Sequence, residues 1–357
     1  MTLLQPDLIF DGQSLRKGVL RLEGDRVLAI QDGAGERIAG ILSPGFIDLQ
    51  VNGGGDVLLN TSPTVAGMQA IAAAHRRFGT VGILPTVITD APDVLDAVTD
   101  AALAARGLPG ILGLHIEGPH ISVPRRGTHK AAFVRPFDDR TLTAVRRLRA
   151  GGVRVMLTLA PEAATPAQVA ELAALGVVIS IGHSDATGAE VRGLLAAGAS
   201  CFTHLFNAMS PMVNRAEGVT GACINSHAFA GIICDGVHVA DEMVGLAIRA
   251  RPLPDTTFLV SDAMPTVGGS DRFTLYGREI HVENGRLVNA EGSLAGAHVT
   301  MAESVKRLID KVGLAPEAAL RMATTIPARV MGLPTGIVGQ SAADLVILDQ
   351  DWQVRAL

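Results

Sequence analysis

The stretch ILGLHIEGPHIS (residues 111–122) is an apolar run that ends in His-x-Glu and then turns through Gly118 and Pro119. An apolar run bounded by Gly and Pro in this way is typical of a buried strand. The same pattern recurs along the chain and gives eight candidate strands in all. They are GFIDLQVN (45–52), VGILPTVI (81–88), GILGLHIE (110–117), VRVMLTLA (153–160), GVVISIGH (176–183), SCFTHLF (200–206), FAGIICDG (229–236) and TFLVSDAM (257–264).

Ala- and Leu-rich segments with helical spacing separate these strands, for example residues 65–79 and 167–176. The second segment follows Thr165 and Pro166, which suit the cap and first turn of a helix. Near-continuous apolar strands joined by helices indicate a parallel sheet that is covered on both faces. Eight such units favour an α/β fold of the closed (β/α)8 TIM-type barrel over an open doubly wound sheet.

The two chain ends have a different pattern. Residues 1–43 and 334–357 carry short alternating stretches that are separated by turn signals. We expect both ends to meet in one small β-sandwich domain and residues 44–333 to form the barrel. The segment FTLYGREIHVENGRLVN (273–289) contains the Asn-Gly signal of a β-hairpin and is expected in the loop after the eighth strand.

Composition limits the partners and the location. Apolar residues make up 48% of the 357 residues, and the net charge is −5, so neither nucleic acid nor an anionic membrane is an expected partner. The N-terminus lacks a signal-peptide pattern, and no apolar run reaches the roughly 18 residues of a membrane span. Cys201, Cys223 and Cys234 have no CxxC spacing and are expected to be reduced and buried. We therefore predict a cytoplasmic protein.

Polar side chains follow most of the candidate strands at the point where each strand ends. The carboxyl ends of barrel strands meet at one mouth, where barrel enzymes keep their chemistry. A single histidine at such a position is more often a hydrogen-bonded core residue, but its repetition at five or six strand ends favours a functional site. The residues are Gln50, Asn52, Glu117, His183, His204, Asp235, His238 and Asp262.

The opening stretch supplies a carboxylate to this mouth. His115 and Glu117 are two residues apart, so both point into the barrel, with Glu117 about 6–7 Å nearer the mouth. We expect His115 to be hydrogen-bonded one layer below. His120 follows the Gly118-Pro119 turn, and its pattern leaves open whether it lines the pocket or faces solvent.

Glu117, His183 and His204 form a set of one carboxylate and two imidazoles. Such a set suits a catalytic divalent cation that keeps a position open for water. Asp262, next to that water, would accept its proton and pass it to a leaving nitrogen. The alternative role for Asp262 is that of a carboxylate that caps a helix.

The motifs PGFIDLQVNG, HIEGPH, GTH, GHSDA, THLFNAM, DGVHV and VSDAM occur here in the order seen in N-acetylglucosamine-6-phosphate deacetylases. Across essentially its whole length the chain resembles this group of the amidohydrolase superfamily. The resemblance implies hydrolysis of the acetamide of N-acetylglucosamine 6-phosphate to glucosamine 6-phosphate and acetate. It also implies that Glu117, His183 and His204 are metal ligands and that Asp262 is the catalytic acid and base.

Further residues match substrate contacts of that group. His129 matches a histidine that contacts the substrate carbonyl oxygen, and Asn207 and the backbone at Ala208 match phosphate-site positions. His238 and Arg215 match further substrate contacts. In related enzymes the arginine reaches the site of the neighbouring subunit, so the resemblance implies a homodimer that binds a small sugar phosphate. From the residue alone, Arg215 could equally be a solvated loop residue.

The first strand bears on the metal count. Many amidohydrolases carry His-x-His there and hold two metals, whereas this strand ends in Gln50 and Asn52. An amide is a poorer ligand than imidazole for a first-row cation. We therefore predict one divalent metal per subunit, Zn²⁺ first and Fe²⁺ or Mn²⁺ as alternatives, with Gln50 and Asn52 as neighbours of the metal site.

Other activities stay open. The same residues could deacetylate N-acetylgalactosamine 6-phosphate or hydrolyse another small amide such as a cyclic ureide. A non-catalytic barrel that acts as a scaffold should have lost Asp262 or a metal ligand, and this chain keeps them. The sequence does not decide what Asp235 and Glu162 do.

Overall fold

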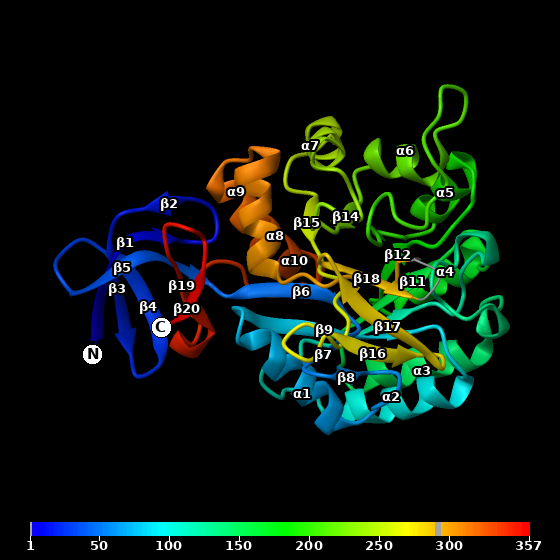
Figure 1. Ribbon diagram of the computed structural model, residues 1–357, viewed down its shortest axis with the longest axis horizontal. Helices are drawn as coiled ribbons and strands as arrows, with labels where there is room; N and C mark the ends of the chain where they lie inside the picture. The colour runs from blue at the N-terminus through cyan, green and yellow to red at the C-terminus, as the bar shows by residue number, and fades with distance from the viewer. Residues whose placement is uncertain (1, 290–293) are drawn as a thin grey trace.

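The computed structural model describes residues 2–289 and 294–357, and eight parallel strands form its centre (Figure 1). Their order is β15-β14-β13-β12-β11-β10-β9-β6, and each pairs in parallel with its neighbour. All eight predicted strands are confirmed, with shorter bounds in most cases. They are β6 (Phe46–Val51), β9 (Thr80–Ile88), β10 (Leu114–Glu117), β11 (Val155–Leu159), β12 (Val178–Ile181), β13 (Cys201–Phe202), β14 (Phe229–Ile232) and β15 (Thr257–Leu259).

The sheet closes between its first and last strands. Val51, at the end of β6, forms a parallel bridge with Ala263, just beyond β15. The amide of Asp262 donates to the carbonyl of Gln50 at 3.0 Å. The closed (β/α)8 barrel is therefore confirmed, and its closing seam runs through two of the predicted site residues.

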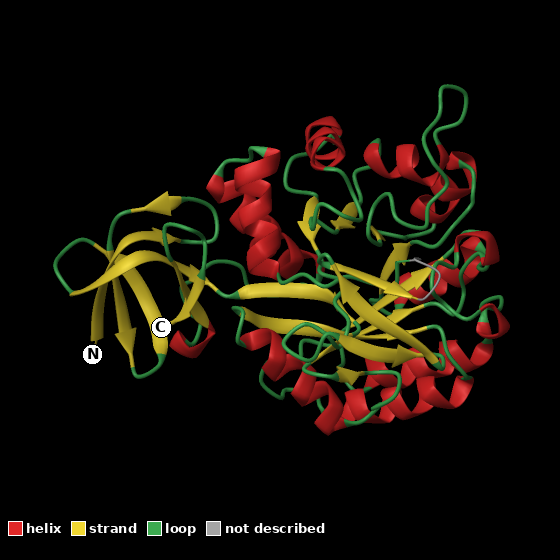
Figure 2. Cartoon of the chain, viewed as in Figure 1, coloured by secondary structure: helices red, strands yellow, loops and turns green. Residues whose placement is uncertain are grey.

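Helices cover the outside of the barrel (Figure 2). The predicted cap at Thr165 is confirmed: its side chain and that of Gln168 form a reciprocal capping box at the start of α4. Among the described residues no helix has the length and apolar character needed to cross a membrane. The α-helices are α1 (Val65–Arg76), α2 (Pro92–Ala104), α3 (Asp139–Ala150), α4 (Pro166–Ala174), α5 (Gly188–Ala196), α6 (Gly218–Ile224), α7 (Asp241–Ala250), α8 (Met301–Arg307), α9 (Pro316–Ala323) and α10 (Thr325–Val330). Shorter turns are η1 (Val123–Arg125), η2 (Ala131–Phe133), η3 (Leu308–Val312) and η4 (Ala342–Asp344).

Strands from both chain ends form a second sheet beside the barrel (Figure 1). Its order is β20-β19-β5-β1-β3-β4, with β2 paired to β1. It has its own apolar cluster, to which Leu20 and Leu42 contribute from the N-terminal part and Leu345 from the C-terminal part. The strands are β1 (Thr2–Phe10), β2 (Leu15–Arg16), β3 (Val19–Glu23), β4 (Arg26–Gln31), β5 (Glu36–Pro44), β19 (Leu345–Leu348) and β20 (Val354–Ala356).

The predicted hairpin after the eighth strand is a three-stranded antiparallel sheet of β16 (Arg272–Leu275), β17 (Arg278–Glu283) and β18 (Arg286–Asn289). Asn284 and Gly285 form its second turn with φ of 52° and 77°, as a two-residue hairpin turn requires. Its apolar face packs on Ile88 and Met264. The insert therefore covers part of the barrel mouth. A short pair, β7 (Gly53–Gly54) and β8 (Val57–Leu58), follows β6.

Candidate metal centre at the barrel mouth

Glu117, His183 and His204 meet at the carboxyl ends of β10, β12 and β13. The Nε2 atoms of the two histidines lie 3.1 Å from Oε1 of Glu117 and 3.0 Å from each other. All three side chains are buried. No other group of three such side chains that could hold a metal occurs within residues 2–289 and 294–357.

These distances suit a first-row cation. In a tetrahedral site with bonds of about 2.0–2.1 Å, neighbouring ligand atoms lie about 3.3 Å apart. Nδ1 of His183 lies 2.9 Å from the carbonyl oxygen of Arg125, to which it can only donate. Neutral His183 therefore keeps its lone pair on Nε2, facing Glu117, as a metal ligand must. The donor set fits a divalent cation.

Charge and burial oppose each other at this cluster. Burial alone would raise the pKa of Glu117, but hydrogen bonds with His183 and His204 hold it well below its usual value. Burial alone would lower the pKa of His204, and its hydrogen bond to Glu117 raises it instead. The pocket therefore favours an anionic Glu117 paired with positive charge.

The residues that enter the cluster have an unusual backbone. His183, His204 and Asp262 have φ values of 48°, 30° and 53°, in the left-handed region that non-glycine residues rarely adopt. Each lies just beyond the end of its strand. Such strain persists only where the surroundings impose it, and it collects at functional sites. Here it turns each side chain across the mouth.

Asp262 is held by the two amides of the first strand. Gln50 Nε2 donates to Oδ1 of Asp262 at 3.1 Å and to Oε1 of Glu117 at 3.0 Å, and Asn52 Nδ2 donates to the same Oδ1 of Asp262 at 2.7 Å. Burial and the negative Glu117 raise the pKa of Asp262. Asp262 caps no helix, so that alternative is excluded. The amide of Gln50 therefore bridges Asp262 and Glu117, and that of Asn52 contacts Asp262 alone.

A cavity of about 160 Å³ opens over this cluster. It is lined by most of the predicted site residues, and it includes Leu294 and Gly296 beyond the insert. Gln50 lies just below and reaches the cavity residues through its hydrogen bonds. The predicted residues that line the cavity are Asn52, Glu117, His129, His183, His204, Asn207, Ala208, His238 and Asp262.

Two further histidines face this cavity. The ring of His129 lies 4.5 Å from that of His183, and its Nδ1 is 2.7 Å from the hydroxyl of Thr89. Burial lowers the pKa of His129 to about 3, which keeps the ring neutral. His238 places its Nδ1 2.6 Å from Oδ2 of Asp235, so that nitrogen carries a proton. Asp235 thus orients His238 and does not line the cavity itself.

Three other residues lie away from the cavity. Arg215 is exposed on the loop before α6 and does not line the cavity of its own subunit. His115 is buried between the hydroxyls of Thr86 and Thr158, which confirms the expected layer below Glu117. His120 neither lines the cavity nor faces solvent, because it is buried with hydrogen bonds to Arg135 and Thr141.

Two residues that support the site were missed from the sequence. Thr89 contacts His129, and Arg125 supplies the carbonyl for His183. Glu162, whose role the sequence left open, accepts hydrogen bonds from the hydroxyl of Ser184 and the amide of Asp185. The Thr89 contact joins side chains 40 residues apart, and the Arg125 contact uses a backbone carbonyl, so neither follows from a sequence motif. Arg125 also forms an exposed ion pair with Asp185 at 2.7 Å.

Comparison with known proteins agrees with this geometry. Residues 41–356 match the model of the Amidohydrolase family. The chain is 41% identical over 325 residues to the N-acetylgalactosamine-6-phosphate deacetylase of Shewanella sp. (strain ANA-3), covering 89% of this chain and 82% of that protein. It is 32% identical over 325 residues to the N-acetylglucosamine-6-phosphate deacetylase of Haemophilus influenzae, covering 88% and 84%. The crystal structure of the N-acetylglucosamine-6-phosphate deacetylase from Pasteurella multocida superposes with a TM-score of 0.92 at 31% identity, covering 99% and 96%.

Proposed function

The chain belongs to the amidohydrolase family, and on this basis we propose that it hydrolyses the acetamide of N-acetylglucosamine 6-phosphate to glucosamine 6-phosphate and acetate. The observation that carries the proposal is the meeting of Glu117, His183 and His204 with Asp262 in one cavity. The names of the relatives from Haemophilus influenzae and Pasteurella multocida support the substrate.

Glu117, His183 and His204 would hold one divalent metal per subunit, Zn²⁺ first and Fe²⁺ or Mn²⁺ as alternatives. When bound, this cation supplies Lewis acidity to a water and to the amide carbonyl. Gln50 and Asn52 present amide nitrogens, not oxygens, to the two carboxylates. An N–H group cannot ligate a cation, which supports a single ion.

Asp262 is the acid and base in this proposal. Gln50 and Asn52 both donate to Oδ1, so Oδ2 is left to accept the proton of the attacking water. The raised pKa of Asp262 makes that proton easier to hold and to deliver to the leaving nitrogen. The low pKa of Glu117 suits the opposite task, because a ligand must stay anionic.

The other cavity residues would bind the substrate. His129 donates from Nε2 to the acetamide oxygen, where negative charge develops, in the tautomer whose Nδ1 accepts from Thr89. Asn207, the backbone at Ala208, and His238 contact the sugar phosphate. Arg215 completes the phosphate site of the neighbouring subunit in a homodimer, which agrees with its exposed loop.

The cytoplasmic location of the protein stays a prediction.

A second candidate substrate is N-acetylgalactosamine 6-phosphate, the epimer at one hydroxyl. It is favoured by the 41% identity to the Shewanella protein of that name. Both substrates place the same acetamide and the same phosphate, so the residues described above serve either. The two candidates differ only in the contacts of that hydroxyl.

The test is acetate release by the metal-loaded protein from each of the two sugar phosphates, with metal content measured on the same sample. We expect release from both, and the larger kcat/KM identifies the substrate. A cyclic ureide serves as the third substrate in the same assay. Full metal loading without acetate from either sugar would overturn the proposal, and turnover of the ureide alone would replace it.

A further inference from the structure

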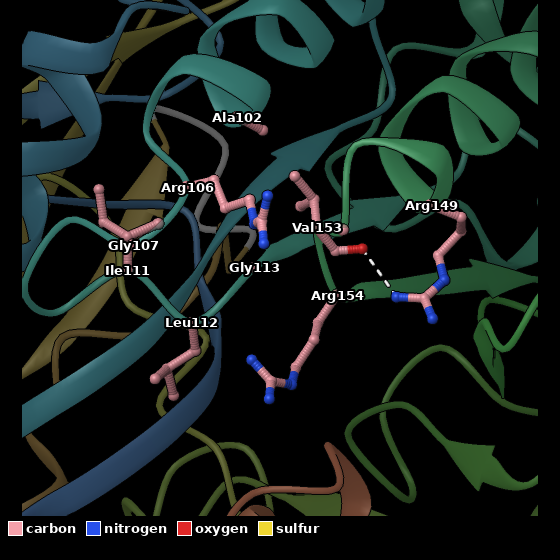
Figure 3. Close-up of a pocket in the computed structure, with 10 residues that line it drawn as sticks. Ala102, Arg106, Gly107, Ile111, Leu112, Gly113, Arg149, Val153 and Arg154 are labelled. Atoms are coloured by element: carbon pink, nitrogen blue, oxygen red, sulfur yellow. Dashed lines mark hydrogen bonds between the residues drawn. The ribbon is translucent and has the colours of Figure 1, made fainter.

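A second and larger cavity lies at the opposite end of the barrel, where β10 and β11 begin. Its volume is about 440 Å³. The cavity is formed by the end of α2, the segment before β10, the end of α3 and the segment before β11. Figure 3 shows Arg106, Arg149 and Arg154 around it. Because Glu117 lies at the carboxyl end of β10, this cavity is separate from the metal centre.

The residues that line this cavity carry positive charge that no acidic lining residue balances. Three arginines and no acidic residue line the cavity. Nearby helix arginines behave differently: Arg140 pairs with Asp93 and Asp96, and Arg147 pairs with Asp100, on the outer surface of α2 and α3. In a chain of net charge −5, three unpaired guanidinium groups around one hollow are a local exception.

These arginines keep free donors. Arg149 uses Nε and Nη1 on the carbonyls of Leu175 and Val153, and Arg154 uses only Nε, on the carbonyl of Met331. The side chain of Arg106 has no hydrogen bond or ion pair within residues 2–289 and 294–357. Its guanidinium lies against Gly152, where a Cβ atom would be 3.0 Å from Cζ. Arg106 and Arg154 thus offer planar, unoccupied N–H groups.

We propose that this cavity binds a small molecule that carries a phosphate group. A guanidinium fork matches phosphate oxygens in pairs, and a phosphate monoester brings nearly two negative charges to the three arginines. The volume lies in the range of about 300–1,000 Å³ of small-molecule sites. The proposal does not depend on the activity at the mouth.

Labelling of individual arginines with phenylglyoxal, followed by peptide mass spectrometry, tests the site in the metal-loaded protein with inorganic phosphate as the probe. At about ten times its Kd, phosphate should slow labelling of Arg106 and Arg154 about tenfold. Labelling of Arg37, an exposed arginine on β5, should not change. Equal labelling of Arg106 and Arg154 with and without phosphate would overturn the proposal.

Calorimetric titration with inorganic phosphate gives a second test. Arg106→Gln removes a side chain that makes no hydrogen bond to the described part of the chain, so the variant should fold and keep its activity. It should weaken phosphate binding at this cavity about tenfold, whereas Arg37→Gln should leave the isotherm unchanged. Any binding at the mouth persists in both variants. An isotherm of Arg106→Gln identical to that of the unaltered protein would contradict the proposal.

Discussion

At the scale of single residues, the proposed role of Asp262 makes two opposite demands. Its burial beside Glu117 raises its pKa and helps it to hold a proton, but a base must first be anionic. The amide groups of Gln50 and Asn52 meet the second demand, because their hydrogen bonds to Oδ1 stabilise the anion without adding a charge. A lysine in their place would lower the pKa of Asp262 and remove its ability to hold a proton.

Asp262→Asn should therefore separate structure from chemistry. The amide oxygen still accepts from Gln50 and Asn52, so the fold and the metal content should remain. The loss of proton transfer should lower kcat for the sugar phosphate by about 10²–10⁴-fold. Steady-state kinetics with metal analysis on the same preparation measure both. Turnover close to that of the unaltered protein would remove Asp262 from the mechanism.

Asp235 is expected to act through His238. In Asp235→Asn the carboxylate that holds the Nδ1 proton is lost, so the ring can turn or change tautomer. We expect KM for the sugar phosphate to rise about tenfold, on the scale of one hydrogen bond to a charged group, with a small change in kcat. The control is Asp255→Asn, whose ion pair with Arg321 lies before the start of β15, at the opposite end of that strand from the mouth. A change in kcat alone would contradict the role in binding.

The carboxylate of Asp235 should also make the free energy of unfolding depend on pH in the acidic range. Burial alone would raise the pKa of Asp235, but its hydrogen bond with His238 lowers it below the ordinary value. A depressed pKa means stability that is present above the unfolded value of about 3.9 and is lost as pH falls through the folded value. Between about pH 5 and 2, the free energy of unfolding should fall more steeply for the unaltered protein than for Asp235→Asn. Parallel curves in urea titrations would refute this.

At the scale of elements, the inserted sheet β16–β18 is tied to the mouth through Tyr276. Its hydroxyl donates to the carbonyl of Thr89, and Thr89 holds His129. Tyr276→Phe should loosen this contact and raise KM by roughly 2–10-fold, as expected for one neutral hydrogen bond of about 0.5–1.5 kcal/mol. Stability should change little, because Leu275 and Ile280 still pack. Substrate titration of both proteins measures the difference, and an unchanged KM would show that the insert does not act on the site.

The strands show how far the sequence could lead. Runs of mostly apolar residues predicted all eight barrel strands, because a strand that is buried on both faces is rich in apolar side chains. Polar residues at the ends of three of these runs predicted the cluster of Glu117, His183 and His204, which could hold a metal ion. The position of His120 could not be predicted, since its partners Thr141 and the carbonyl of Arg135 lie on later segments. The arginine cavity was also missed, because Arg106, Arg149 and Arg154 share no motif.

At the scale of the whole molecule, metal removal should lower stability as well as activity. Three ligands from three different strands come together only in the folded chain, so the ion binds the native state alone. Stripping an ion present at a thousand times its Kd removes about 4 kcal/mol and should lower Tm on the order of 5–10 °C. Calorimetry with and without chelator tests this, and metal analysis should return one ion per chain. Two tightly held ions that activity requires would contradict the single site.

The division of the chain into a barrel at residues 44–333 and a β-domain formed by both chain ends stays a proposal.

The predicted homodimer has the sharpest test. The loop before α6 projects from the molecule (Figure 1) and exposes Met212 and Val213 beside Arg215. If Arg215 acts in the partner's site, Arg215→Ala should raise KM strongly for the phosphorylated sugar and little for the unphosphorylated one. Asp262→Asn, in contrast, should disable the site of its own subunit.

Mixing these two variants distinguishes the subunits, at a concentration of the phosphorylated sugar far below the KM of Arg215→Ala, where both variants have little activity. In a mixed dimer, the site that keeps Asp262 receives Arg215 from its partner and is complete. Random exchange of equal amounts should restore roughly a quarter of the sites, because half of the dimers are mixed and each has one complete site. An arginine that served its own subunit would leave every site in the mixture defective. Activity regained on mixing therefore means that Arg215 acts in the site of the partner subunit. A mixture with no more activity than its components means that Arg215 does not act across the interface.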